Sequence, residues 1–170
     1  MNIILFGFMA TGKTTVGVEL SKKIGYEFID TDHEIEKRSG VTISEIFKIE
    51  GEASFRIKER NMISSISGLD RRVIACGGGA LLDRENVSKL SRNSKMILLK
   101  ASSYSILRRV DGDETRPLLN SNDREKSITK LMAERMPFYL KVADFVIETD
   151  KKTPSQLADE IISRLGGCLI

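Results

Sequence analysis

Short apolar runs alternate along this chain with longer stretches in which apolar residues recur every three or four positions. The runs cover residues 3–6, 27–30, 73–76, 96–99 and 145–148. Runs of this length are typical of strands, whereas the longer stretches have the period of amphipathic helices. Strands that alternate with helices are joined by crossovers and pair in parallel. The pattern therefore predicts a three-layer α/β/α fold with a central five-stranded parallel sheet.

Capping signals mark the starts of two of the expected helices. Thr42 with Glu45 and Thr153 with Gln156 form capping boxes, and Pro154 occupies the first helical position of the second helix. In a capping box two backbone N–H groups at the helix start are satisfied by side chains. These two helix starts are therefore predicted more firmly than the other boundaries.

Length and composition indicate one globular domain over residues 1–170. Hydrophobic residues make up 41% and charged residues 30%, as in soluble proteins. The sequence contains no secretory signal and no apolar stretch near the roughly 20 residues that span a bilayer, so we expect a cytoplasmic protein without a membrane partner. The 27 basic and 24 acidic residues are interspersed, which gives no indication of nucleic-acid binding. Cys76 and Cys168 are expected to be free thiols.

A phosphate-binding motif follows the first apolar run directly. Residues 7–14 read GFMATGKT, which matches the P-loop pattern G-x-x-x-x-G-K-[ST] between an expected strand and an expected helix. In such a loop, backbone N–H groups and the positive end of the helix dipole surround the phosphates. Lys13 is expected to reach the β- and γ-phosphates, and Thr14 to give its hydroxyl to Mg²⁺. The motif predicts a site for a magnesium-bound nucleotide.

Two carboxylates, Asp30 and Asp32, come at the end of the second expected strand. Ligands bind at the carboxyl edge of parallel sheets. Asp30 is expected to act on the Mg²⁺ shell, and Asp32 to accept a hydrogen bond from a substrate hydroxyl. Alternatively, Asp32 caps the helix that follows, as Asp often does.

Three glycines, Gly77, Gly78 and Gly79, follow the third expected strand. They allow either a close backbone approach to a ligand or a simple flexible turn. Arg56 and Glu59 share a face of the helical stretch 52–66, a spacing that by itself indicates an exposed ion pair.

Three further features lie outside these motifs. Arg135 is expected to end a helix directly before residues 136–139, where its charge complements the helix dipole. The polar segment 111–122 is typical of a functional loop such as a lid. The single histidine, His33, and the small apolar side chain of Cys76 are not expected to be catalytic.

Taken together, these motifs resemble those of the shikimate kinases, a family of small P-loop phosphotransferases with a fold like that of nucleoside monophosphate kinases. The resemblance covers nearly the whole chain. It rests on GFMATGKTT at 7–15, DTD at 30–32, GEASFRIKE at 51–59, GGG at 77–79, RPLL at 116–119, ERMPFY at 134–139 and TDKKTP at 149–154. A P-loop is common, but this ordered combination is specific.

The resemblance implies transfer of a phosphoryl group from ATP to shikimate by a monomer. It implies catalytic roles for Lys13, Asp32 and Arg116, a mobile lid at 111–122 and a substrate-binding helical region at 32–66. The implied shikimate pocket consists of Asp32, Arg56, Gly77, Gly78, Gly79 and Arg135, with Glu59 orienting Arg56. The implied nucleotide site consists of Ala10, Thr11, Gly12, Lys13, Thr14, Thr15, Arg109, Arg116, Lys152 and Pro154, with Arg109 and Pro154 on either side of adenine. Thr14 and Asp30 are the implied Mg²⁺ ligands.

One position departs from the family pattern, which commonly has a third glycine where this chain has Ala10. A backbone that needs a positive φ there is strained by alanine. We expect the protein to keep its function despite this departure. The property that alanine would affect is the affinity for the nucleotide.

The residues by themselves leave two other functions open. Another small-molecule kinase, such as a gluconate or nucleoside monophosphate kinase, uses the same P-loop chemistry, and gluconate also offers a carboxylate and hydroxyls. A regulatory module that binds a nucleotide without transferring phosphate is the second alternative. Lys13, Thr14, Asp32 and Arg116 argue against it.

Overall fold

The fold is known from a computed structural model, which describes residues 1–110 and 124–166. Among these residues, five parallel strands form one sheet in the order β2-β3-β1-β4-β5. The strands are β1 (Asn2–Phe6), β2 (Glu27–Asp30), β3 (Arg72–Ala75), β4 (Ser94–Lys100) and β5 (Phe145–Glu148). All five predicted strands are confirmed, and β4 extends beyond its apolar run at both ends.

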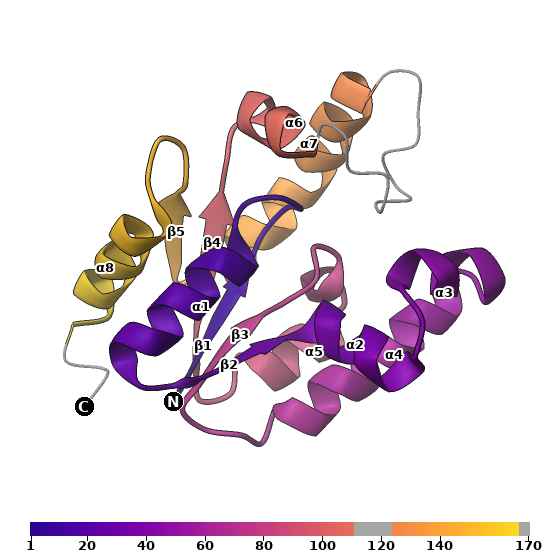
Figure 1. Cartoon of the computed structure of the whole chain (residues 1–170), viewed down its shortest axis with the longest axis horizontal. Coiled ribbons are helices and arrows are strands. Elements are labelled where there is room, and N and C mark those ends of the chain that lie inside the picture. Colours follow the sequence, from indigo (N-terminus) through magenta and orange to yellow (C-terminus); the bar gives the residue numbers. More distant parts are fainter. Residues whose placement is uncertain (111–123, 167–170) are drawn as a thin grey trace.

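Helices cover both faces of the sheet (Figure 1). They are α1 (Lys13–Ile24), α2 (Thr31–Ser39), α3 (Ile43–Ile49), α4 (Glu52–Ile66), α5 (Arg84–Leu90), α6 (Ser103–Val110), α7 (Arg124–Val142) and α8 (Pro154–Leu165), with a short 3₁₀ helix, η1 (Ala80–Leu82). The helices α2, α3 and α4 gather at the end of the molecule opposite α8, beyond the edge strand β2. The predicted three-layer α/β/α fold is confirmed.

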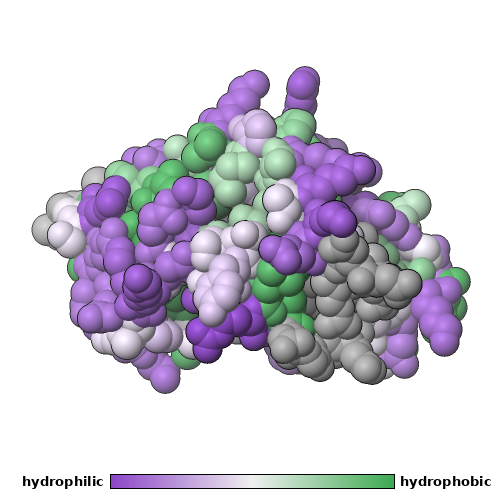
Figure 2. All heavy atoms as spheres, turned by 90° about the horizontal axis from the view of Figure 1, so that it is seen from above, coloured by the Kyte–Doolittle hydropathy of each residue, from purple (hydrophilic) through white to green (hydrophobic). Residues whose placement is uncertain are grey.

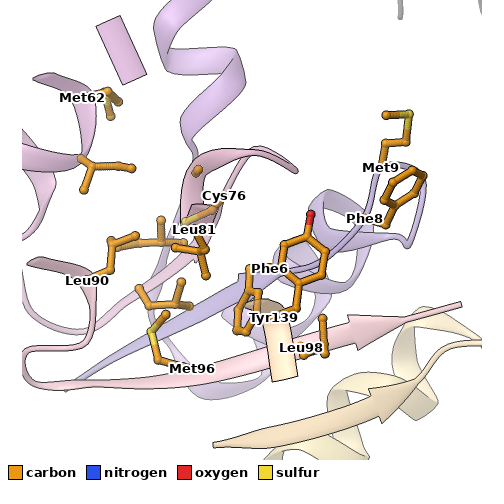
Figure 3. Packing of buried hydrophobic residues seen from close by; sticks show 14 of the residues in the cluster. Phe6, Phe8, Met9, Met62, Cys76, Leu81, Leu90, Met96, Leu98 and Tyr139 are labelled. Carbon is orange, nitrogen blue, oxygen red and sulfur yellow. The ribbon is translucent and has the colours of Figure 1, made fainter. Parts of the chain in front are cut away.

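The alternation of side chains along β1 builds two separate cores. Ile3 and Leu5 point to the face covered by α1 and α8, where they pack with Leu20 and Leu157. Ile4 and Phe6 point to the opposite face, where the larger core lies. Figure 3 shows part of this larger core, with Phe6, Leu90, Met96, Leu98 and Tyr139 among its side chains. A sheet buried on both faces explains why the central strand β1 is apolar at every position from Ile3 to Phe6.

Both predicted capping boxes are present. The Thr42 and Thr153 hydroxyls accept hydrogen bonds from the N–H groups of Glu45 and Gln156. In return, the Glu45 and Gln156 side-chain oxygens accept hydrogen bonds from the N–H groups of the two threonines. Pro154 is the first residue of α8, as predicted.

The expected helix end at Arg135 is wrong, because α7 continues to Val142 with Pro137 inside it. An internal proline removes one helical hydrogen bond and costs about 3 kcal/mol. Burial of Tyr139, two residues beyond the proline, counteracts this cost. Tyr139 is only 1% exposed, and its ring meets that of Phe6 edge-on with the centroids 5.9 Å apart.

The strands run toward the P-loop, so their carboxyl ends form the upper edge in Figure 1, and Figure 2 views the molecule from that side. Hydrophilic side chains cover much of this face, with smaller hydrophobic areas between them. In the described part of the chain, no helix is long and apolar enough to cross a membrane. The expected lid at 111–122, including Arg116, and Cys168 lie outside the described residues.

Candidate active site

The P-loop joins β1 to α1 and closes on itself through its own polar side chains. Nζ of Lys13 donates hydrogen bonds to the carbonyl oxygens of Gly7, at 3.2 Å, and Phe8, at 2.8 Å. The buried hydroxyl of Thr11 donates to the Phe8 carbonyl at 2.9 Å. Gly7 is required sterically, because a Cβ there would lie 2.3 Å from the carbonyl oxygen of Leu99 on β4. The Lys13 ammonium is thus held inside the loop at the start of α1, where the helix dipole is also positive.

Ala10 has a φ of 57°, so its backbone adopts the left-handed conformation that favours glycine. An L-residue in this conformation costs about 1–2 kcal/mol. Nη1 of Arg109, at the end of α6, donates a hydrogen bond to the Ala10 carbonyl at 2.9 Å. The strain expected from alanine at this position is therefore present, and Arg109 braces the strained peptide.

Asp30 connects the P-loop helix to the start of α2. Its Oδ2 accepts a hydrogen bond from the Thr14 hydroxyl at 2.6 Å, and its Oδ1 accepts the N–H groups of Asp32, at 3.1 Å, and His33, at 3.3 Å. Asp30 is the N-cap of α2, so the alternative that Asp32 caps this helix is wrong. Asp32 lies instead in the first turn of α2.

A cavity of about 320 Å³ at the carboxyl edge of the sheet brings the P-loop and Asp32 together. It is lined by Ala10, Gly12, Lys13, Thr14, Thr15, Asp30, Asp32, Ala75, Cys76 and Arg109. Burial raises the pKa of the Cys76 thiol, so this side chain lines the cavity as a neutral thiol. His33 is exposed and does not line this cavity.

The glycine run 77–79 passes close to side chains of α2 and α4. A Cβ on Gly77 would lie 2.4 Å from Oδ1 of Asp32, and a Cβ on Gly79 would lie 2.6 Å from Nη1 of Arg56. The backbone of this loop thus fits directly against the Asp32 carboxylate and the Arg56 guanidinium. In the described residues, the close approach that the glycines permit is to these two side chains.

Arg56 and Glu59 form an ion pair on α4 in which the carboxylate is buried and the guanidinium is partly exposed. Nη1 of Arg56 donates to Oε2 of Glu59 at 2.8 Å, and Nη2 of Arg56 donates to Glu52 at 2.9 Å. Glu59 is only 1% exposed, so the exposed pair that the spacing indicated is wrong. Burial raises the pKa of Glu59 to about 7, despite the opposing effect of Arg56. Burial also disfavours the charge of Arg56, but the two carboxylates outweigh it and raise the Arg56 pKa.

Arg135, on α7, contacts the same glycine loop as Arg56, on α4. Its Nη1 lies 3.4 Å from the Gly78 carbonyl oxygen, which also accepts a hydrogen bond from the Tyr139 hydroxyl. The guanidinium of Arg135 lies over the ring of Phe8, 5.9 Å from its centroid. The loop therefore brings Arg56 and Arg135, which are far apart in the sequence, to neighbouring residues.

Pro154, another predicted nucleotide residue, lines a second hollow. This hollow of about 510 Å³ is lined by Thr14, Thr15, Val18, Glu19, Lys22, Thr153, Pro154 and Ser155, and it shares Thr14 and Thr15 with the first cavity. Pro154 and Arg109 thus lie on different hollows that meet at the start of α1. Lys152 lines neither hollow, and its ammonium pairs with Glu160 at 2.6 Å.

Sequence reasoning missed Tyr139. The spacing of four residues from Arg135 places both on one helix face, which would have been a signal had α7 been expected to continue.

In the described part of the chain, no group of three or more His, Cys, Asp or Glu residues forms a metal-binding cluster. The Thr14 hydroxyl and the Asp30 carboxylate, 2.6 Å apart, are oxygen donors at the end of the P-loop.

The chain matches known proteins along nearly its whole length. The sequence model of the family described as "Shikimate kinase" matches residues 9–166. The shikimate kinase of Caldicellulosiruptor bescii is 46% identical over 162 residues, which cover 95% of this chain and 94% of that protein. The shikimate kinase of Thermodesulfovibrio yellowstonii is 45% identical over 161 residues, with 95% and 92% covered.

Solved structures agree with the sequence comparisons. The shikimate kinase from Acinetobacter baumannii in complex with shikimate has a TM-score of 0.93 at 37% identity, with 96% of this chain and 92% of that chain covered. A gluconokinase from Sinorhizobium meliloti shares only the fold, with a TM-score of 0.56 at 13% identity and 99% and 94% covered. From its P-loop, its glycine loop and these full-length matches, the chain belongs to the shikimate kinase family.

Proposed function

We propose that this protein transfers the γ-phosphoryl group of ATP to the 3-hydroxyl of shikimate, giving shikimate 3-phosphate and ADP. The observation that carries the proposal is the cavity in which the P-loop residues Lys13 and Thr14 share a surface with Asp32. A phosphoryl donor and a hydroxyl acceptor can meet there. The Acinetobacter baumannii relative was solved with shikimate, which supports the choice of acceptor.

The P-loop supplies the charge that the donor needs. Phosphoryl transfer proceeds through a loose transition state, so alignment and charge stabilisation account for most of the catalysis. Lys13 at the start of α1 binds the β- and γ-phosphates in this proposal, and the N–H groups of the loop surround them. Arg116, which lies outside the described residues, supplies a further cation by resemblance to the family.

The acceptor is held between the glycine loop and two arginines. Asp32 orients the 3-hydroxyl, whose oxygen forms a bond to the γ-phosphorus while the bond to the β-phosphate oxygen breaks. The hydroxyl proton passes to the Asp32 carboxylate late in the transfer. Arg56 and Arg135 bind the substrate carboxylate, because a planar guanidinium pairs with a carboxylate through charge-assisted hydrogen bonds.

The donor set around Thr14 fits Mg²⁺. The Thr14 hydroxyl lies 2.6 Å from Oδ2 of Asp30, which places two hard oxygen donors beside the phosphate loop. Mg²⁺ prefers such oxygen ligands. Mg²⁺ held there would shield the negative charge of the phosphate oxygens. We assign its protein contacts to Thr14 and Asp30.

In this proposal the nucleotide base lies between Arg109 and Pro154, and Ala10, Thr11, Gly12, Thr15 and Lys152 complete the nucleotide site. We further propose a single domain that acts as a cytoplasmic monomer, with residues 32–66 as the substrate-binding region and residues 111–122 as the lid. Sedimentation of the protein with and without substrates tests the proposed monomer.

The test of the function is ADP release from Mg-ATP with shikimate, gluconate or AMP offered separately, against a control without acceptor. We expect strong stimulation by shikimate alone. Stimulation by gluconate or AMP instead would overturn the choice of acceptor. Nucleotide binding without turnover on any acceptor would favour the regulatory alternative.

A further inference from the structure

Tyr139 makes a polar contact at the edge of the larger core. Its side chain is 1% exposed, and its ring packs edge-on against Phe6. Figure 3 shows the ring beside Phe6 and Leu98, with the hydroxyl pointing away from them. That hydroxyl donates a hydrogen bond to the carbonyl of Gly78, in the middle of the glycine loop. A buried core residue of α7 therefore holds the backbone of the proposed acceptor site.

Arg135 lies one helical turn before Tyr139 and reaches for the same oxygen. Its Nη1 is 3.4 Å from the Gly78 carbonyl, which is beyond the usual range for a hydrogen bond between nitrogen and oxygen. The tyrosine hydroxyl is thus the main donor to this carbonyl. The Arg135 guanidinium lies beside this carbonyl and over the ring of Phe8.

The same hydrogen bond fixes the direction of a backbone donor. A trans peptide is planar, so the N–H of Gly79 points opposite to the carbonyl of Gly78. Because Tyr139 holds that carbonyl toward α7, the Gly79 N–H points away from α7. Arg56 of α4 lies against Gly79, and Asp32 of α2 lies against Gly77.

We infer that Tyr139 is a positioning residue for the acceptor substrate: its hydroxyl orients the Gly78–Gly79 peptide and keeps the Gly78 carbonyl from drawing Arg135 away from the substrate carboxylate. This inference rests on the proposed function. Tyr139 touches neither substrate in this assignment and acts through Gly78 and Arg135. Loss of its hydroxyl should therefore weaken acceptor binding and leave the nucleotide site unchanged.

The test compares Tyr139→Phe with Tyr104→Phe. Phenylalanine keeps the ring that packs on Phe6 and removes only the hydroxyl. Tyr104 is a matched control, because it is 68% exposed and lies on α6 away from the glycine loop. KM for shikimate, KM for ATP and kcat are measured for both variants, with thermal unfolding as the check on folding.

We expect Tyr139→Phe to raise KM for shikimate about five- to tenfold, the effect of one lost hydrogen bond, with KM for ATP within about twofold of wild type. Tyr104→Phe should match the wild type. An unchanged KM for shikimate, or an equal loss for both substrates, would overturn the inference. If shikimate fails to stimulate the wild-type protein itself, the proposed function fails and this inference falls with it.

A double-mutant cycle with Arg135→Lys separates positioning from packing. If the hydroxyl acts through Arg135, the two changes should not be additive, and Tyr139→Phe should raise KM for shikimate less in the lysine background. Additive effects would contradict a role through Arg135.

Discussion

Nη1 of Arg56 donates a hydrogen bond to Oε2 of Glu59 at 2.8 Å, and the carboxylate that receives it is almost fully buried. The other oxygen of Glu59, Oε1, has no hydrogen-bond partner in the described part of the structure. Burying a carboxylate with one oxygen unsatisfied is costly, which is why the pKa of Glu59 rises to about 7. The pair holds the Arg56 guanidinium beside Gly79, where we propose that the substrate carboxylate binds. The protein therefore keeps a buried carboxylate that lowers its stability at this site.

Glu59 should therefore make stability depend on pH in the opposite sense to ordinary carboxylates. Between its unfolded pKa near 4.5 and its folded pKa near 7, the folded protein holds a proton that the unfolded chain has released. The free energy of unfolding should thus fall as pH rises through this window, by about 2–3 kcal/mol. Glu59→Gln should lose this slope. Urea unfolding of both proteins from pH 5 to 8 measures it, and identical slopes would show that Glu59 does not titrate there.

Asp32→Asn should lower kcat about 100-fold or more, because the amide cannot accept the hydroxyl proton. ATP binding should change little, since the phosphates are held by the P-loop. Steady-state kinetics and nucleotide titration measure the two effects. Glu34→Gln, in the same first turn of α2, is the control and should behave as wild type. Wild-type turnover in Asp32→Asn would remove the proposed catalytic role.

Replacing Arg56 or Arg135 by Ala should raise KM for shikimate about 10- to 100-fold, the usual effect of losing hydrogen bonds between charged groups. KM for ATP should stay close to the wild-type value. Arg60→Ala provides the control, because Arg60 lies one turn after Arg56 on α4 and pairs with Asp83. A defect confined to ATP would show that the carboxylate assignment is wrong.

Ala10→Gly should change the nucleotide affinity by no more than about twofold. The loop itself and the Arg109 hydrogen bond to the Ala10 carbonyl hold Ala10 at its positive φ, so we expect the strain of about 1–2 kcal/mol to be the same with and without nucleotide. Ala10→Val should weaken nucleotide binding strongly, because a β-branched residue resists this conformation. Calorimetric titration with ADP tests both variants. Much tighter binding by the glycine variant would mean that the loop reaches its positive φ only with the nucleotide.

The strands, the two capping boxes and the P-loop could be predicted because each is a local property. Ile3 to Phe6 form a strand from their own apolar run, and Thr42 and Thr153 start helices through partners three residues away. The resemblance to a family came from such local motifs in a fixed order. The family and the fold were therefore accessible from the sequence, as the comparisons confirm.

Contacts between distant segments were not accessible in this way. Spacing alone indicated an exposed Arg56–Glu59 pair, whereas packing buries Glu59. Sequence also left open that Asp32 caps α2, whereas Asp30 is the cap. The helix α7 passes through Pro137 because Tyr139 gains a buried position against Phe6. Burial and partner choice depend on which elements the sheet order brings together. Tertiary packing therefore decided which charges are desolvated and which side chains meet at the glycine loop.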